Sequence, residues 1–173
     1  VLVEGFNPTL KSAVLRFKLD EEGVKLKAPL KDDPHVITTF ESSNQDWAFG
    51  ADGIAFDSKG NLFVGLFGDG KMFKIELAAD GKVKSNKLFA ELPGKLINCD
   101  GMACDTRTDK LYVADSAANA IQIINPDGTV ETLAQNEDTL DKKTGGLDQP
   151  CEAMLRGDEI IVGDESHTLH YEV

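Results

Sequence analysis

The sequence is short of basic residues, of aromatic residues and of long apolar runs. Its 18 Lys and Arg residues stand against 30 Asp and Glu residues, which gives a formal net charge of −12. Binding to nucleic acid needs clustered positive charge, so this balance argues against a nucleic-acid partner. No apolar run approaches the ~20 residues that a helix needs to cross a bilayer, so no membrane partner is expected. The segment Val1-Leu2-Val3 is strand-like and lacks the basic flank of a signal peptide, and the compartment is not predicted.

Cysteine is also scarce, with three residues in the chain, Cys99, Cys104 and Cys151. No two of them form a CxxC pair, which argues against zinc-ribbon and thioredoxin-type sites. Cys99 and Cys151 each precede an acidic residue that recurs along the chain, so a disulfide between them is one alternative. Buried free thiols are the interpretation that we prefer, because free cysteine is among the most buried residue types.

What the chain does contain is a repeat. The segment Asp52–Asp57 reads DGIAFD and the segment Asp100–Asp105 reads DGMACD, and each is followed by short strand-like runs. A self-similar period of roughly 40–50 residues made of such runs is typical of β-propeller blades. We therefore predict an all-β fold built from blades of four antiparallel strands, with about three to four blades in this chain.

The repeat divides the single predicted domain into four units, at residues 1–40, 52–92, 100–134 and 150–173. The outer strands are expected at Val36–Phe40, Lys87–Leu92 and Thr129–Leu133. In this alignment the first unit lacks its innermost strand and the last unit lacks its outermost strand. Open sheet edges invite pairing with other chains. We therefore expect further blades, or a second chain, to cover them.

Three acidic residues, Asp52, Asp100 and Glu152, begin successive units. Equivalent positions in neighbouring blades are related by the rotation of the propeller, so these side chains should surround the central tunnel. Converging carboxylates raise each other's pKa unless a cation lies among them. Ca²⁺ binds carboxylate and amide oxygens. We predict a divalent-metal site made of Asp52, Asn98, Asp100 and Glu152, with Ca²⁺ as the favoured ion.

A structural role is the alternative for each aspartate taken singly, because an Asp-Gly pair often forms a turn in which the carboxylate caps backbone N–H groups. Glu152 is followed by Ala153 rather than by glycine, so turn formation does not account for the acid there. Asp115 and Asp164 end the predicted second strands, and we expect them to brace the adjacent loops. Surface or packing roles are expected for the three histidines, His35, His167 and His170.

The stretch DGIAFD-x-KGNLFV at residues 52–64, with Asp100-Gly101-Met102 and the run LYVADS at 111–116, resembles the senescence marker protein/gluconolactonase (regucalcin-like) family. This family is related to paraoxonases and strictosidine synthases. The resemblance covers roughly residues 52–165 and implies a six-bladed propeller with a divalent metal, usually calcium, held by Glu, Asn and Asp. Glu152 matches the Glu and Asp52 the Asp, whereas Asp100-Gly101 stands where the family often has Asn-Gly.

The resemblance implies hydrolysis of a small-molecule lactone or ester at the central tunnel. In that hypothesis the metal polarises the carbonyl group, and Asp52 or Asp100 activates water as a general base. The alternative is a non-catalytic propeller that binds a protein or a ligand, because NHL-repeat propellers share this style of sequence. A fold alone does not decide between them. Stoichiometric divalent metal in the protein would favour the enzyme.

Overall fold

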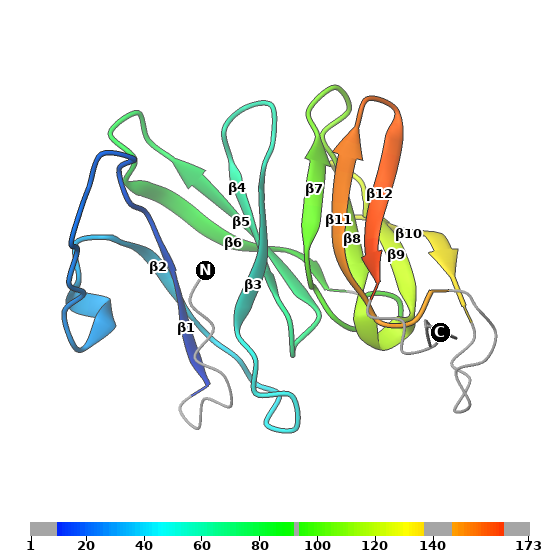
Figure 1. The fold of residues 1–173 in the computed structure, drawn as a ribbon, viewed down its shortest axis with the longest axis horizontal. Coiled ribbons are helices and arrows are strands. Elements are labelled where there is room, and N and C mark those ends of the chain that lie inside the picture. Colours follow the sequence, from blue (N-terminus) through cyan, green and yellow to red (C-terminus); the bar gives the residue numbers. More distant parts are fainter. Residues whose placement is uncertain (1–9, 92–93, 137–146, 165–173) are drawn as a thin grey trace, which may run out of the picture.

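The computed structural model describes residues 10–91, 94–136 and 147–164. Within these ranges the chain forms two four-stranded and two two-stranded sheets, all antiparallel (Figure 1). Each four-stranded sheet has its strands in chain order, from the innermost to the outermost. The predicted class is therefore confirmed, because this is the arrangement of β-propeller blades.

The first sheet contains β1 (Lys11–Leu15) and β2 (Val36–Glu41). The second, called here blade two, contains β3 (Ala51–Phe56), β4 (Leu62–Leu66), β5 (Lys71–Leu77) and β6 (Val83–Glu91). The third, called blade three, contains β7 (Met102–Asp105), β8 (Lys110–Asp115), β9 (Ala120–Ile124) and β10 (Val130–Gln135). The last contains β11 (Pro150–Arg156) and β12 (Glu159–Asp164). Two 3-10 turns lie at Leu30–Asp32 and Ser116–Ala118.

Aspartates fold the hairpin that follows the first strand of each complete blade. The Asp57 carboxylate accepts hydrogen bonds from the backbone N–H groups of Lys59 and Asn61, at 3.0 and 2.8 Å. The turn also needs a left-handed residue, and Gly60 supplies it with φ of +78°. In blade three, Asp105 accepts a bond from the Arg107 backbone in the same way. The last acid of DGIAFD and DGMACD is thus a turn residue.

Two apolar cores lie between successive sheets. One joins β1–β2 to blade two and includes Val14, Leu62 and Val64. The other joins blade two to blade three and includes Phe63 and Leu111. Side chains alternate between the two faces of a strand, so β4 supplies both cores and is buried along its whole length. A strand covered on both faces reads as a continuous apolar run, which is why Leu62-Phe63-Val64 marked the repeat so clearly.

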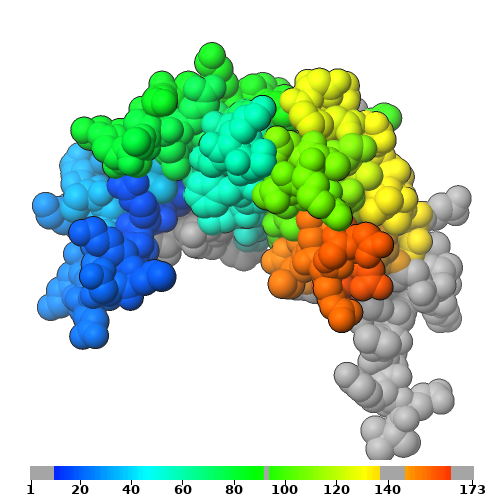
Figure 2. Space-filling view, turned by 90° about the horizontal axis from the view of Figure 1, so that it is seen from above, coloured from blue at the N-terminus to red at the C-terminus, as the bar shows by residue number. Residues whose placement is uncertain are grey.

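The sheets follow one another around an arch whose two ends are β1–β2 and β11–β12 (Figure 2). Contacts run from β1 to β3, from β3 to β7 and from β7 to β11. The outer strands β2, β6 and β10 overlap the segments expected for them. The strands expected at Val1–Gly5 and Thr168–Val173 lie outside the described residues. In the described ranges the helical segments are the two 3-10 turns, and neither is long enough to cross a bilayer.

Candidate functional site

The inner strands bring two of the predicted acids into contact. Asp52 lies near the start of β3, and Asp100 lies just before β7. Burial raises the pKa of Asp52; the side chain of Asp100 opposes this effect, and the negative charge of Glu152 adds to it.

Glycine follows each aspartate because the next sheet approaches the backbone closely. A Cβ atom on Gly53 would overlap the carbonyl oxygen of Asp100. A Cβ atom on Gly101 would lie 2.6 Å from the carbonyl oxygen of Cys151 and 2.5 Å from Oε1 of Glu152. Gly53 lies within strand β3, and neither glycine has a left-handed φ. The Asp-Gly pairs therefore mark contacts between sheets. Asp100 also shows part of the structural alternative, because its carboxylate accepts a hydrogen bond from the Gly101 N–H at 3.0 Å.

Glu152 reaches the same region one residue out of register. Strand β11 has an irregularity in its pairing between Pro150 and Glu152. The Gly101 N–H donates to the carbonyl oxygen of Cys151 at 3.0 Å, so Cys151 stands against Gly101 where Asp100 stands against Gly53. The Glu152 carboxylate accepts a hydrogen bond from the Ala153 backbone N–H at 3.0 Å. Glu152 as a whole is exposed. The structure thus places Glu152 beside the aspartates, from a bulged strand.

The buried side chain of Asn98 joins two loops. Its Nδ2 donates to the carbonyl oxygen of Phe67 at 2.9 Å, and its Oδ1 accepts from the Ala117 N–H at 3.0 Å. Its own backbone N–H donates to Asp115 at 2.9 Å. Both ends of the amide are therefore occupied by backbone partners. In this arrangement Asn98 connects the segment that precedes β7 with the loops that follow β4 and β8.

Asp115 and Asp164 brace loops, as the sequence predicted. Asp115 is fully buried and accepts bonds from the backbone of Ile97 at 3.0 Å and from Gln122 Nε2 at 3.1 Å. Burial raises the pKa of Asp115, and these bonds oppose the rise. Asp164 accepts from the Asp148 N–H at 3.1 Å. Sequence reasoning missed a third residue of this kind, Asp69, which holds the backbone N–H groups of two residues, Ser43 and Asn44.

All three cysteines are free, in agreement with the preferred interpretation, but only Cys99 is fully buried, whereas Cys104 and Cys151 are half-buried. Burial raises the pKa of Cys99 far above its usual range, and raises the pKa of Cys104 to about 11. Such thiols are poor nucleophiles at neutral pH. His35 has the packing role expected of it, because it is hydrogen-bonded to Asp33 at 2.7 Å and stacked on Phe17. The other two histidines, His167 and His170, lie outside the described residues.

Asp52, Asp100 and Glu152, called here the acidic group, carry the type of oxygen atoms that hard cations bind. Burial together with the charge of Glu152 raises the pKa of Asp52. As the described residues stand, however, no three His, Cys, Asp or Glu side chains are close enough to form a metal site. A bound ion would have to draw Glu152 and the two aspartates closer together.

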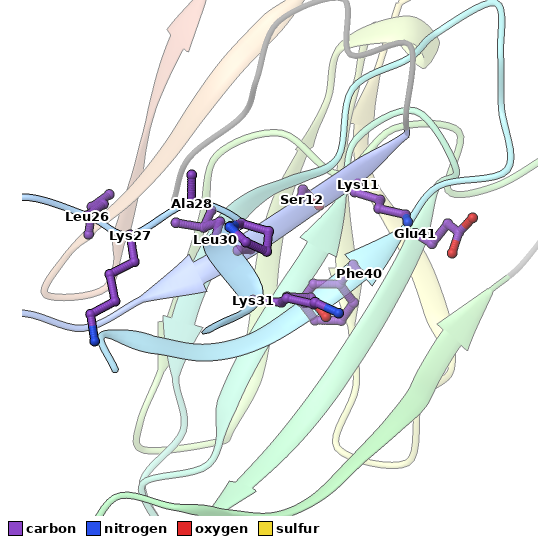
Figure 3. A pocket seen from close by; sticks show the side chains of 12 residues that line it. Lys11, Ser12, Leu26, Lys27, Ala28, Leu30, Lys31, Phe40 and Glu41 are labelled. Carbon is purple, nitrogen blue, oxygen red and sulfur yellow. The ribbon is translucent and has the colours of Figure 1, made fainter. Parts of the chain in front are cut away.

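A cavity of about 870 Å³ lies elsewhere, between β1–β2 and the segment 26–31 (Figure 3). Its lining includes Lys11, Leu26, Leu30 and Phe40, and none of the predicted site residues. The cavity lies at the β1–β2 end of the arch, whereas the predicted acidic residues lie at the starts of inner strands. The acidic group therefore does not sit in that hollow.

No protein-family model and no curated protein sequence matches the chain. Several solved structures resemble it. Regucalcin from Agrobacterium tumefaciens, a calcium-binding protein, is 17% identical with a TM-score of 0.52, over 69% of this chain and 39% of that one. A gluconolactonase-family protein is 17% identical with a TM-score of 0.52, over 67% and 36%. Virginiamycin B lyase from Staphylococcus aureus is 14% identical with a TM-score of 0.52, over 75% and 39%.

These likenesses show the fold. The chain has the β-propeller architecture of regucalcin and gluconolactonase proteins, which confirms at that level the resemblance seen in its motifs. It spans less than two fifths of the length of these structures. The lyase among them has a different activity on the same architecture, so chemistry has to be argued from the residues of the site.

Proposed function

We propose that this chain belongs to a divalent-metal-dependent hydrolase of lactone or ester type, whose site lies at the central tunnel. The observation that supports the proposal is the close approach of the inner strand starts, where Asp100 lies against Gly53 and Glu152 lies against Gly101, so that Asp100 and Glu152 both act on buried Asp52. Burying adjacent carboxylates costs free energy unless they are neutralised. A fold does not need such a cluster for stability, so a role in binding a cation accounts for it better.

The three acids would hold the ion, and Asn98 would join them only by giving up its bond to Ala117. When bound, a Ca²⁺-type ion supplies positive charge that polarises a substrate carbonyl group. The aspartates have a second role in this proposal. An oxygen of either aspartate that the ion does not engage would be free to take a proton from water as a general base. We assign this role to Asp52 or Asp100.

The calcium-binding description of regucalcin and the name of the gluconolactonase support this reaction class for a chain of the same architecture. Metal binding can be tested separately from catalysis. Elemental analysis of dialysed protein should find a stoichiometric divalent ion. Thermal unfolding should then show stabilisation by calcium, which at 100 times the dissociation constant amounts to about 2.7 kcal/mol. For a chain of this size that corresponds to roughly 5–10 °C.

The decisive variant is Glu152→Gln, with Glu159→Gln on the neighbouring exposed strand as its control. Glu152→Gln removes one anionic ligand and should lose most of the calcium-dependent rise in melting temperature. In chelator it should be neutral or slightly more stable, because one repulsive charge has gone. Glu159→Gln should respond to calcium as the wild type does. Equal melting temperatures with and without calcium in the wild type would refute the metal site.

Hydrolysis is tested by following acid release from a panel of sugar lactones and aryl esters at constant pH, with and without calcium. We expect calcium-dependent turnover that is lost in Asp52→Asn or Asp100→Asn. Protein that binds the ion but hydrolyses no member of the panel would support the non-catalytic, ligand-binding propeller instead.

A further inference from the structure

The imidazole ring of His35 is held in one orientation by a buried carboxylate. The side chain of Asp33 is 1% exposed, and its Oδ1 lies 2.7 Å from Nδ1 of His35. The same carboxylate accepts hydrogen bonds from the backbone N–H groups of Lys27 and His35, at 2.6 and 2.8 Å. These bonds lower the pKa of Asp33 to about 2, so the carboxylate is ionised and can only accept. In the neutral ring the proton is therefore on Nδ1, and Nε2 carries the lone pair.

A second carboxylate lies on the Nε2 side of the ring. Oε2 of Glu21 is 3.5 Å from Nε2 of His35, which is longer than the ~2.7–2.9 Å of a charge-assisted hydrogen bond. In a tetrahedral zinc site with metal–ligand distances of about 2.1 Å, an imidazole nitrogen and a carboxylate oxygen lie about 3.4 Å apart. The separation of these two atoms therefore suits two ligands of one zinc ion.

The space beside the two side chains is large enough for a hydrated ion. A cavity of about 260 Å³ is lined by Arg16, Lys18, Glu21, Pro34 and His35. A water molecule occupies about 30 Å³ in the liquid, so the cavity has room for an ion and several waters. The Arg16 guanidinium is engaged elsewhere, because its Nη1 donates to the Gly81 carbonyl oxygen at 3.0 Å. Lys18 is exposed, and solvent screens its charge.

The backbone fixes both residues before any ion is bound. The Lys18 N–H donates to Oε2 of Glu21 at 3.0 Å, and the Glu21 N–H donates to the Lys18 carbonyl oxygen at 3.2 Å. The Arg16 N–H donates to the His35 carbonyl oxygen at 2.8 Å, and Phe17 stacks on the His35 ring. Ligands that are already in place lose little conformational entropy on binding.

This cluster lies at the other end of β1 from the acidic group. Ser12, near the start of β1, accepts a hydrogen bond from the Ala51 N–H, directly before Asp52. Arg16 and His35 come after the end of β1 and before the start of β2. A metal bound by His35 is therefore separate from the ion of the proposed hydrolase site.

We propose that Glu21 and His35 bind a zinc ion, with Asp33 as the carboxylate that orients the imidazole. Metal-binding histidines usually donate their other ring N–H to such a group. Zinc suits a mixed nitrogen and oxygen pair, whereas calcium takes oxygen ligands. No third His, Cys, Asp or Glu side chain completes the set within the part of the chain that the structure describes. Water molecules would fill the remaining positions, which stay open to exchange.

Zinc titration of the 173-residue chain, followed by ¹H–¹⁵N NMR of the histidine rings, is the first test. The His35 signals are assigned by their loss in His35→Gln. Before zinc is added they should report the Nδ1–H form of the ring, and zinc should shift the Nε2 signal. In calorimetry His35→Gln should lose one zinc equivalent. A ring that carries its proton on Nε2, or an Nε2 signal that zinc does not move, would overturn the proposal.

The second test compares Glu21→Gln with Glu22→Gln, a matched control from the same turn. Glu21→Gln should weaken zinc binding at least tenfold, whereas Glu22→Gln should bind as the wild type does. Asp33→Asn should weaken it by about 10–100-fold, the usual effect of removing such a partner. Equal affinities in the two glutamine variants would mean that zinc binds to a single histidine, which also contradicts the proposal. Glu152→Gln should leave the His35 signals and their zinc response unchanged, so this test is independent of the proposed hydrolase site.

Discussion

Replacing Gly101 with alanine tests both the contact between sheets and the position of the acidic group. The new Cβ atom would lie 2.6 Å from the Cys151 carbonyl oxygen and 2.5 Å from Glu152 Oε1, about 1 Å inside normal contact distance. The carbonyl belongs to a strand backbone, so relief requires β11 to move away from β7. That movement stretches the 3.0 Å hydrogen bond from the Gly101 N–H to Cys151.

The expected cost follows from these contacts. Overpacking costs about 1–3 kcal/mol, and the weakened hydrogen bond adds about 1 kcal/mol. Alanine loses less backbone entropy than glycine on folding, which returns about 0.5–1 kcal/mol. The net loss in the free energy of unfolding should be about 1–3.5 kcal/mol, or roughly 2–14 °C in melting temperature.

Gly157→Ala is the control for the substitution itself. Gly157 has a φ of +64° and nothing within 4 Å of the added Cβ atom, so only backbone strain of about 1 kcal/mol is expected. Urea unfolding of both variants, each in calcium and in chelator, measures the two costs. Gly101→Ala should also reduce the response to calcium, because Glu152 is displaced, whereas Gly157→Ala should not. A Gly101→Ala protein as stable as the wild type would refute the close contact between β7 and β11.

Two further predictions concern buried aspartates. Asp115→Asn replaces one acceptor oxygen by an NH₂ group that faces backbone donors, so it should cost about 1–3 kcal/mol in urea unfolding, and an unchanged midpoint would contradict the bracing role. Hydrogen bonds lower the pKa of Asp33 and of Asp105 from 3.8 to about 2 in the folded protein. Their stabilisation is therefore complete above the unfolded value and is lost as the pH falls from 4 towards 2. Asp105→Asn should flatten the pH dependence of the urea midpoint in that window, and an unaltered slope would contradict the assignment.

The parts of the fold that the sequence predicted are those with a local signal. Strand β4 is apolar at every position because both of its faces are covered, and Asp57 with Gly60 specifies the turn before it. The extent of β1 could not be predicted in this way. Apolar and polar residues alternate through Phe17 and Leu19, which is typical of a strand that continues to Leu19, but β2 starts at Val36, which faces Leu15. Beyond that pair no partner strand is present in the described residues, and Phe17 and Leu19 are exposed.

The candidate site also has features that the sequence predicted and features that it could not predict. An acid at the start of each unit was visible in the sequence, and the contact of Asp52 with Asp100 agrees with the repeat. The bulge in β11 was not visible, because an extra residue shifts the pairing without changing the order of residue types. The reason for Gly53 and Gly101 was hidden as well, since each avoids a clash with a sheet that lies about one repeat further along the chain.

Asn98 is the residue for which the sequence hypothesis and the geometry make opposite predictions. As a metal ligand it should matter only when calcium is present. As a link between loops it should matter in calcium and in chelator alike, because Asn98→Ala leaves the Phe67 carbonyl and the Ala117 N–H without their partner. Each such loss costs about 1–3 kcal/mol, so we expect a total of about 2–6 kcal/mol in either buffer. Asn98→Asp keeps an acceptor for Ala117 but has no donor for Phe67, and it should be destabilised to an intermediate degree. It would retain calcium binding if Asn98 were a ligand. A variant that keeps its stability in chelator and loses the calcium response would return Asn98 to the metal site.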